Sequence, residues 1–257
     1  MRFIALTLVA LLLGGCASGP RIDDSFTARG QSSRVQYIVL HYTSTGMARS
    51  LALLTQGEVS AHYLIGDAPA KVYRLVDEDR RAWHAGESEW QGRTWLNASS
   101  IGIELVNQGY FDGPQGRYWQ PYGEAQMQAL IALLKDLVKR HGLPIDSIVG
   151  HSDIAPQRKV DPGPLFPWRR LAEAGLIRWP DAARVAARRA EFERALPDAL
   201  WFQQQLARVG YGLEFSGQFD EPTRRVLAAF QMKYRQARYD GEADAETAAL
   251  LATLNGR

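Results

Sequence analysis

Short apolar runs rich in β-branched residues recur through the first two thirds of the chain. Residues 35–41 read VQYIVLH, which predicts a buried strand that ends in a histidine. Residues 100–106 alternate, so that three aliphatic side chains share one face while Gly102 and Glu104 lie on the other. Similar short strands are predicted at 61–65, 71–76 and 147–150.

Helical spacing is clearest at residues 123–141, where apolar side chains recur every three or four positions. Gly142 follows directly and favours the end of a helix at that point. A shorter helix is predicted at 50–56. Strands mixed with one strong helix indicate an α/β or α+β domain over residues 33–178.

The last third of the chain changes character. Residues 179–194 are rich in Ala and Arg, which favour a helical linker. Beyond the linker, the pattern Gly-x-x-Asp-x-x-Thr occurs at 217–223 and again at 241–247, each time before an apolar helical run. Gly suits a turn, and Asp or Thr can cap the helix that follows. We therefore predict a small all-α domain at 195–257, although two turn-helix units can also resemble each other by chance.

The chain starts like a secretory signal. Met1 and Arg2 precede an apolar run of about eleven residues, which is too short to cross a bilayer roughly 30 Å thick. The run ends in Leu-Gly-Gly-Cys, which resembles the bacterial lipobox, in which the cysteine is lipidated and becomes the mature N-terminus. An ordinary signal peptide that is cut after small residues is the alternative.

The lipobox interpretation divides the N-terminus into a signal peptide at 1–16, a lipid on Cys16 and a polar tether at 17–32. Ala17 stands where the inner-membrane retention signal of lipoproteins would place an Asp. The expected location is therefore the periplasmic face of the outer membrane, where the lipid would hold the protein.

The charge balance and the single cysteine narrow the possible partners. With 30 basic and 28 acidic residues the net charge is +2, which provides no overall field for nucleic acid, and none is expected as a partner. Cys16 is the only cysteine, so an intramolecular disulfide and a multi-cysteine metal site are excluded. Any metal in the folded part must be held by nitrogen and oxygen atoms.

Three residues have the chemistry of a metal site. His41 ends one predicted strand, His151 follows another, and Asp161 comes ten residues later. Two imidazoles and a carboxylate leave a fourth position open, as in catalytic zinc sites. Spacing alone is weak evidence, because a histidine at a strand end often serves only the core or the surface.

The sequences around these residues resemble the type 2 N-acetylmuramoyl-L-alanine amidases, whose T7-lysozyme-like domain is shared with the peptidoglycan recognition proteins. The matching strings are VSAHYLI at 59–65, WHAGES at 83–88, SIGIELVN at 100–107 and GHSDIAPQRKVDPG at 150–163. The predicted C-terminal domain resembles a small helical peptidoglycan-binding domain, and the matching strings are FQQQLARVGY at 202–211 and AAFQ at 228–231.

The resemblance implies an α/β fold in which helices flank a mixed central sheet. It implies Zn²⁺ on His41, His151 and Asp161. It also implies that Glu104 is the general base and that Lys159 stabilises charge on the tetrahedral intermediate. The implied activity is that of a hydrolase in cell wall turnover, which cleaves the amide between N-acetylmuramic acid and L-Ala in peptidoglycan or its anhydro-muropeptides.

Two further histidines and two other activities stay open. His62 either lines the substrate groove or fills the core. His84, beside Trp83, resembles a groove segment, with core packing as the alternative. The same fold also serves non-catalytic peptidoglycan recognition proteins, although these usually lack a full ligand set. A zinc peptidase that cuts within the stem peptide is the second alternative.

Overall fold

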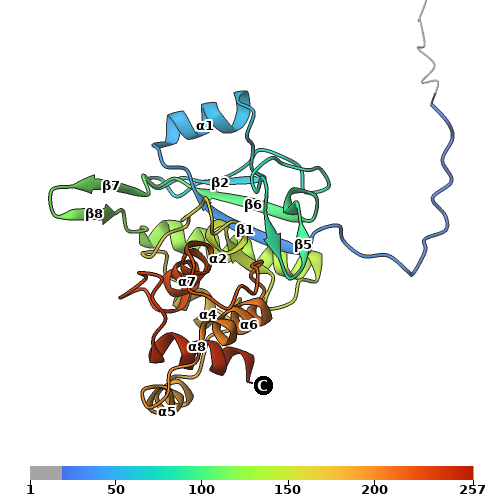
Figure 1. Cartoon of the computed structure of the whole chain (residues 1–257). Coiled ribbons are helices and arrows are strands. Elements are labelled where there is room, and N and C mark those ends of the chain that lie inside the picture. Colours follow the sequence, from blue (N-terminus) through green and yellow to red (C-terminus); the bar gives the residue numbers. More distant parts are fainter. Residues whose placement is uncertain (1–18, 257) are drawn as a thin grey trace, which may run out of the picture. The chain divides into compact units, whose positions relative to one another are not determined.

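The predicted strands assemble into a five-stranded sheet with the order β3-β2-β6-β1-β9 (Figure 1). At its centre, β1 (Tyr37–Tyr42) runs parallel to both β6 (Ser100–Leu105) and β9 (Ile148–Gly150). Beyond β6 come the parallel strand β2 (Tyr63–Ile65) and the antiparallel edge strand β3 (Val72–Arg74). The mixed central sheet implied by the resemblance is therefore confirmed.

The computed structural model describes residues 19–256. The predicted signal peptide at 1–16, the lipid expected on Cys16 and the first two residues of the tether lie outside the described residues. Residues 19–32 contain no helix or strand, and they belong to a different unit from the chain after residue 32. Between residues 19 and 256, no helix combines the length and the apolarity needed to cross a membrane.

One face of the sheet is packed mainly with apolar side chains. The predicted helix at 123–141 is α2 (Glu124–His141), which ends at Gly142 with a φ of 63°. Its buried side chains share a core with alternate residues of β1 and β6, and this α2-side core includes Ile38, Leu40, Ile101, Ile103, Leu105, Met127, Leu130, Leu134 and Leu137. The three aliphatic side chains that the alternation at 100–106 assigns to one face thus lie together in this core.

The other face of the sheet shares its core with the C-terminal helices. These are α5 (Ala182–Phe192), α6 (Ala199–Val209), α7 (Glu221–Tyr234) and α8 (Ala245–Asn255). This second core joins sheet residues to helix residues, among them Tyr37, Val39, Val149, Phe202, Leu206, Phe230 and Leu251. Residues 33–257 accordingly form one unit, and Figure 1 shows α6, α7 and α8 grouped below the sheet.

The repeated Gly-x-x-Asp-x-x-Thr pattern builds the same cap twice. Asp220 accepts a hydrogen bond from the backbone N–H of Thr223 at 2.9 Å, and Asp244 accepts one from Thr247 at 2.8 Å. These aspartates are the N-caps of α7 and α8, as the sequence predicts. The repeat is therefore structural, with equivalent hydrogen bonds at both turns.

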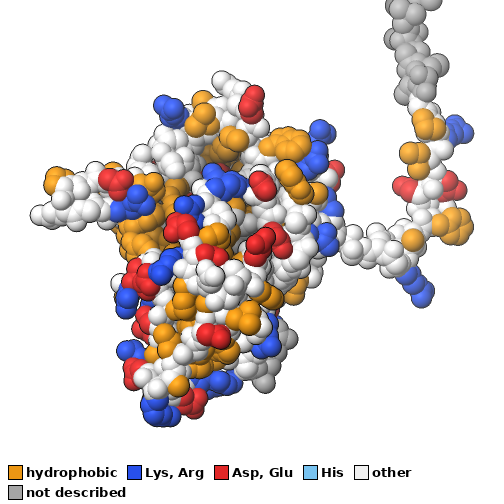
Figure 2. Space-filling model, in the orientation of Figure 1, with side chains coloured by type: hydrophobic (Ala, Val, Ile, Leu, Met, Phe, Trp, Pro, Cys, Tyr) orange, Lys and Arg blue, Asp and Glu red, His pale blue; other side chains and the backbone are white. Residues whose placement is uncertain are grey.

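Several elements were not predicted from the sequence pattern. The short ones are β4 (Glu89–Trp90), β5 (Arg93–Thr94), η1 (Leu96–Ala98), α3 (His151–Ile154) and α4 (Trp168–Glu173). The hairpin of β7 (Tyr110–Gly113) and β8 (Gly116–Trp119) projects at the left of Figure 1, and α1 (Met47–Gln56) begins three residues before the predicted helix. On the face drawn in Figure 2, basic and acidic side chains are interspersed.

Candidate metal centre and active-site cleft

The candidate site lies at the carboxyl ends of the central parallel strands. His41 of β1 is directly opposite Glu104 of β6 in the strand register, so both side chains lie on the same face of the sheet. His151 is the first residue of α3 and follows β9 without a break. The ends of parallel strands are where α/β folds commonly hold their ligands.

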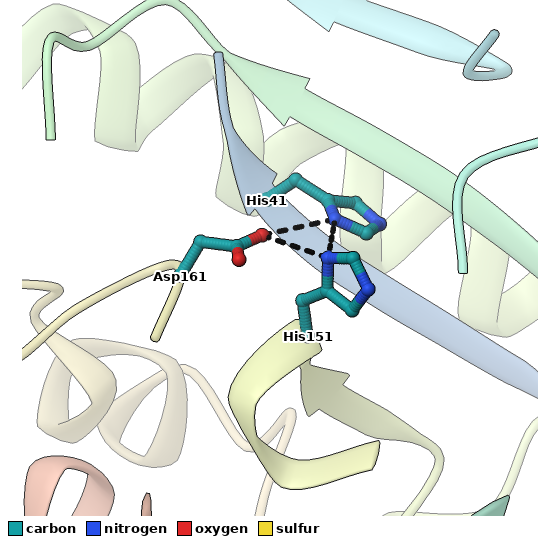
Figure 3. Close-up of side chains that lie close together, drawn as sticks. All are labelled: His41, His151 and Asp161. Atoms are coloured by element: carbon teal, nitrogen blue, oxygen red, sulfur yellow. Dashed lines mark hydrogen bonds and ion pairs between the residues drawn. The ribbon is translucent and has the colours of Figure 1, made fainter. Parts of the chain in front are cut away.

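Three side chains converge there, as Figure 3 shows. The Nδ1 atoms of His41 and His151 are 2.9 Å apart, and each is 3.1 Å from Oδ2 of Asp161. All three residues are buried. The predicted ligand residues are thus brought together from a strand end, a helix start and a loop, and we call this group the metal centre.

The outer nitrogen of His151 determines which ring nitrogen carries its proton. Its Nε2 atom lies 3.1 Å from the carbonyl oxygen of Ala85. Because a carbonyl can only accept a hydrogen bond, Nε2–H is the donor, and in the neutral ring Nδ1 holds a lone pair. That lone pair is directed at the metal centre.

A chain of hydrogen bonds determines the proton position on His41 in the same way. The hydroxyl of Ser100 donates to the carbonyl of Leu96 at 2.6 Å, so its oxygen is free to accept from Nε2–H of His84 at 3.2 Å. Nδ1 of His84 then accepts from Nε2–H of His41 at 3.1 Å. The neutral ring of His41 therefore also presents an Nδ1 lone pair to the metal centre.

Two nitrogen lone pairs and a carboxylate that face one another in a buried site repel each other, and a bound cation would relieve that repulsion. Burial, together with the neighbouring His151, lowers the pKa of His41 to about 4, so this ring is neutral near pH 7. Burial opposes ionisation of Asp161, yet the adjacent histidines hold the pKa of its carboxyl below the ordinary value. Bonds of about 2.0–2.1 Å in a tetrahedral site place neighbouring ligand atoms roughly 3.3 Å apart, close to the separations found here. The donor set fits a divalent metal.

Glu104 and Lys159 stand beside the metal centre on the wall of one cleft of about 420 Å³. Burial, reinforced by the charge of Asp161, raises the pKa of Glu104 to about 8, while Lys159 acts in the opposite direction. Among the described residues, the buried Oε2 atom of Glu104 has no hydrogen-bond partner. An acid–base group left unpaired in a cleft is available to a substrate.

The structure separates the two histidines whose roles the sequence leaves open. His84 lines the cleft, as do Trp83, which is half exposed, and Tyr110 of the projecting hairpin. His62 is fully buried and does not line the cleft. It accepts from the backbone N–H of Gly102 at 3.0 Å, and its Nε2–H donates to a backbone carbonyl at 3.1 Å. His62 thus serves the interior behind His84.

Gly102 is what admits His84 to this position. A Cβ atom at Gly102 would lie 2.4 Å from Cγ of His84, which is far inside van der Waals contact. The backbone N–H groups of His84 and Ala85 both donate to Oδ1 of Asn97, at 3.0 and 2.8 Å. The WHAG string identifies His84 as a candidate groove residue. Nothing in the sequence indicates the hydrogen bond between His84 and His41 or the supporting role of Asn97.

Comparisons with known proteins agree with this site. Residues 31–164 match the family described as N-acetylmuramoyl-L-alanine amidase, and residues 196–251 match a putative peptidoglycan binding domain. The N-acetylmuramoyl-L-alanine amidase AmiD of Escherichia coli K12 is 43% identical over 268 residues, which cover 98% of this chain and 97% of AmiD.

Two solved structures match nearly the whole chain. AmiD from E. coli, in complex with the substrate anhydro-N-acetylmuramic acid-L-Ala-D-gamma-Glu-L-Lys, has a TM-score of 0.83 and 42% identity, covering 92% of this chain and 94% of that one. AmpDh3 of Pseudomonas aeruginosa has a TM-score of 0.85 and 40% identity, covering 93% and 98%. The fold and the family resemblance are both confirmed. This chain belongs to the N-acetylmuramoyl-L-alanine amidase family, in its AmiD/AmpD-like group, and carries a C-terminal peptidoglycan-binding domain.

Proposed function

We propose that this protein is a zinc-dependent amidase that hydrolyses the bond between N-acetylmuramic acid and L-Ala of the stem peptide, in anhydro-muropeptides or in peptidoglycan. The observation that carries the proposal is the convergence of His41, His151 and Asp161 beside the unpaired Glu104 in one cleft. The match to AmiD, which was solved with an anhydro-muramyl peptide, supports this substrate class.

Zinc is the metal that the donor set favours. Two imidazole nitrogens and one carboxylate oxygen form the three-ligand set of many catalytic zinc sites, and between residues 19 and 256 there is no thiol to close the fourth position. Bound Zn²⁺ would supply Lewis acidity and lower the pKa of a coordinated water to about 7.

Glu104 would move the proton. In its ionised form Glu104 can accept a proton from the attacking water and hand it to the departing amide nitrogen of L-Ala, and its raised pKa makes that form a stronger base than an ordinary carboxylate. Lys159, on the same cleft wall, would place its ammonium near the carbonyl oxygen that gains negative charge during attack. The roles of these two residues follow from the family resemblance together with their position.

The match at 196–251 supports peptidoglycan as the partner of the C-terminal helices. Binding to the polymer there would raise the effective concentration of substrate at the cleft.

The N-terminal sequence supports an anchored location. We expect a lipid on Cys16 to hold the protein on the periplasmic face of the outer membrane, since Leu-Gly-Gly-Cys follows a short apolar run. Mass spectrometry of the mature N-terminus, purified from membranes, tests this. An unmodified mature end that starts elsewhere than at Cys16 would refute the anchor.

Digestion of a purified anhydro-muropeptide by the zinc-loaded protein, with products identified by mass, tests the activity. We expect a free anhydro-muramyl sugar and an intact stem peptide that begins with L-Ala. Glu104→Gln should keep its zinc and lose a factor of about 10²–10⁴ in rate, the usual size of an acid–base contribution. Asp161→Asn should lose both the metal and the activity.

The same assay separates the alternatives. Fragments cut within the stem peptide would identify a peptidase. Binding of the muropeptide without any cleavage, with zinc present, would identify a recognition protein. Full turnover by Glu104→Gln would remove Glu104 from its assigned role.

A further inference from the structure

A buried ion pair connects the C-terminal helices to the short helix that begins with His151. Nζ of Lys233, on α7, lies 2.8 Å from Oδ2 of Asp153, on α3. The two side chains are 6% and 1% exposed, so solvent hardly screens the pair. In the sequence, Asp153 is two positions after His151, which belongs to the metal centre.

Both oxygens of the Asp153 carboxylate accept hydrogen bonds from other parts of the chain. Oδ2 also accepts from the backbone N–H of Gly150, the N-cap of α3, at 2.8 Å. Oδ1 accepts from the hydroxyl of Tyr211, in the loop after α6, at 2.7 Å. The Gly150 bond closes the first turn of α3 in the manner of a capping box, and His151 is part of that turn.

Lys233 also lies against an aromatic ring of the amidase domain. Its ammonium lies 4.3 Å from the ring centre of Trp168, the first residue of α4. The ring of Tyr211 packs edge-on against Trp90 at 5.0 Å between centroids. Asp153 therefore lies inside a shell made jointly by the amidase domain and the C-terminal helices.

The helix α3 depends on this shell because it has only four residues. A helix of that length has no stability of its own in water and takes its geometry from tertiary contacts. If Lys233 or Tyr211 is removed, the buried carboxylate loses a partner, and such a group is costly to leave unpaired. The carboxylate must then move toward water, and the first turn of α3 moves with it.

We infer that the C-terminal helices complete the metal centre, with Lys233 and Tyr211 acting through Asp153 as positioning residues for His151. The inference rests on the metal binding proposed above. The C-terminal domain thus has a second role, distinct from holding peptidoglycan. It orients a metal ligand.

The test uses the full-length protein carrying Lys233→Met, which keeps an apolar side chain of similar length. The zinc dissociation constant is measured by competition with a chromogenic chelator, on samples shown to be folded by circular dichroism. We expect zinc affinity to fall about tenfold or more, the size seen when the outer support of a metal ligand is removed. Tyr211→Phe, which removes one hydroxyl, should lower affinity by about threefold and keeps the test open if Lys233→Met does not fold.

Two further variants separate positioning from general stability. Arg235→Met removes another nearly buried cation of the C-terminal domain, which pairs with Asp244 and not with α3. It should lower the melting temperature and leave zinc affinity within twofold. The double variant Asp153→Asn with Lys233→Met removes both charges of the pair, and it should bind zinc more tightly than Lys233→Met alone.

The zinc-binding assay separates failure of the positioning role from failure of the proposed function. If the unaltered protein binds no zinc in this assay, the metal centre itself is refuted, and this inference falls with it. If the unaltered protein binds zinc and the folded Lys233→Met and Tyr211→Phe variants bind it equally well, only the positioning role is overturned. An equal loss of affinity in Arg235→Met would also overturn it.

Discussion

The two faces of the central sheet differ in what holds them together. The α2-side core is mostly aliphatic and comes mainly from the strands and from one long amphipathic helix, with Phe166, Trp168 and Leu171 added from α4 and the segment before it. On the other face, β6 places Ser100, Gly102 and Glu104 where the first face has Ile101, Ile103 and Leu105. On the face that carries the chemistry, β6 thus contributes no apolar side chain, and the sheet residues of that core come from β1 and β9.

This difference explains why the second face takes its support from elsewhere. Apolar side chains that packed against the cleft residues would occupy the space that a substrate needs. The cleft residues are therefore held by hydrogen bonds and by contacts with the C-terminal helices. Stability and chemistry are therefore separated across the sheet. Changes on the α2 side should affect folding, and changes on the cleft side should affect metal binding.

The largest expected effect is on the α2 side. Leu130 is fully buried in the α2-side core, and Leu130→Ala should lower the free energy of unfolding by about 2–5 kcal/mol because it leaves a cavity. Chemical denaturation measures the loss. The folded fraction should bind zinc with unchanged affinity, and a matching drop in affinity would break the proposed separation of the two faces.

A smaller effect is expected from His84 on the cleft side. His84→Ala removes the acceptor of the His41 N–H, and zinc affinity should fall by about 10–100-fold because the ring of His41 is no longer oriented. Competition with a chelator measures the change. His62→Ala is the matched control, since both ring nitrogens of this buried histidine are used by backbone groups and, between residues 19 and 256, no hydrogen bond joins it to His41. It should cost stability and keep zinc affinity within about threefold, because the orientation of a metal-ligating ring is set mainly by its own hydrogen-bond partners.

The smallest expected effect is a pH dependence on the α2 side. Burial opposes ionisation of Glu78, but hydrogen bonds from Arg140, Tyr63 and His141 dominate and lower its pKa to about 2. A depressed carboxylate pKa stabilises the folded state above the ordinary pKa near 4.5, and this stabilisation is lost as the pH falls toward 2.

Glu78→Gln should therefore lower the free energy of unfolding by about 1–2 kcal/mol at pH 7, a value reduced for the partial solvent exposure of Glu78. The difference from the unaltered protein should shrink between pH 4.5 and about 2. Urea denaturation at a series of pH values measures it. A difference that stays constant down to pH 2 would contradict the assigned cause.

The sequence predicts the strongly patterned elements of this fold. The alternation at 100–106, the apolar spacing at 123–141 and the repeated helix caps each depend on local residues, and the structure confirms all three. The grouping of His41, His151 and Asp161 is also recovered, because their strand-end positions and the family resemblance agree. The roles proposed for Glu104 and Lys159 stay predictions.

The remaining features depend on contacts between distant parts of the chain. The helix α3 is too short to leave a periodic pattern, and its conformation comes from Asp153 and its partners. Nothing in the sequence pairs Asp153 with Lys233, which lies 80 positions away. The shared core of the sheet and the C-terminal helices is hidden for the same reason, since an apolar position does not identify its partner.

The nitrogen and oxygen ligands of the metal centre have a consequence for oxidation. Thiolate ligands are lost when oxidants convert cysteine to a disulfide or a sulfenic acid. The sole cysteine of the chain is Cys16, so His41, His151 and Asp161 offer no sulfur to oxidise. Metal retention should thus be the same under oxidising and reducing conditions, and the protein can be purified in air without a thiol reductant.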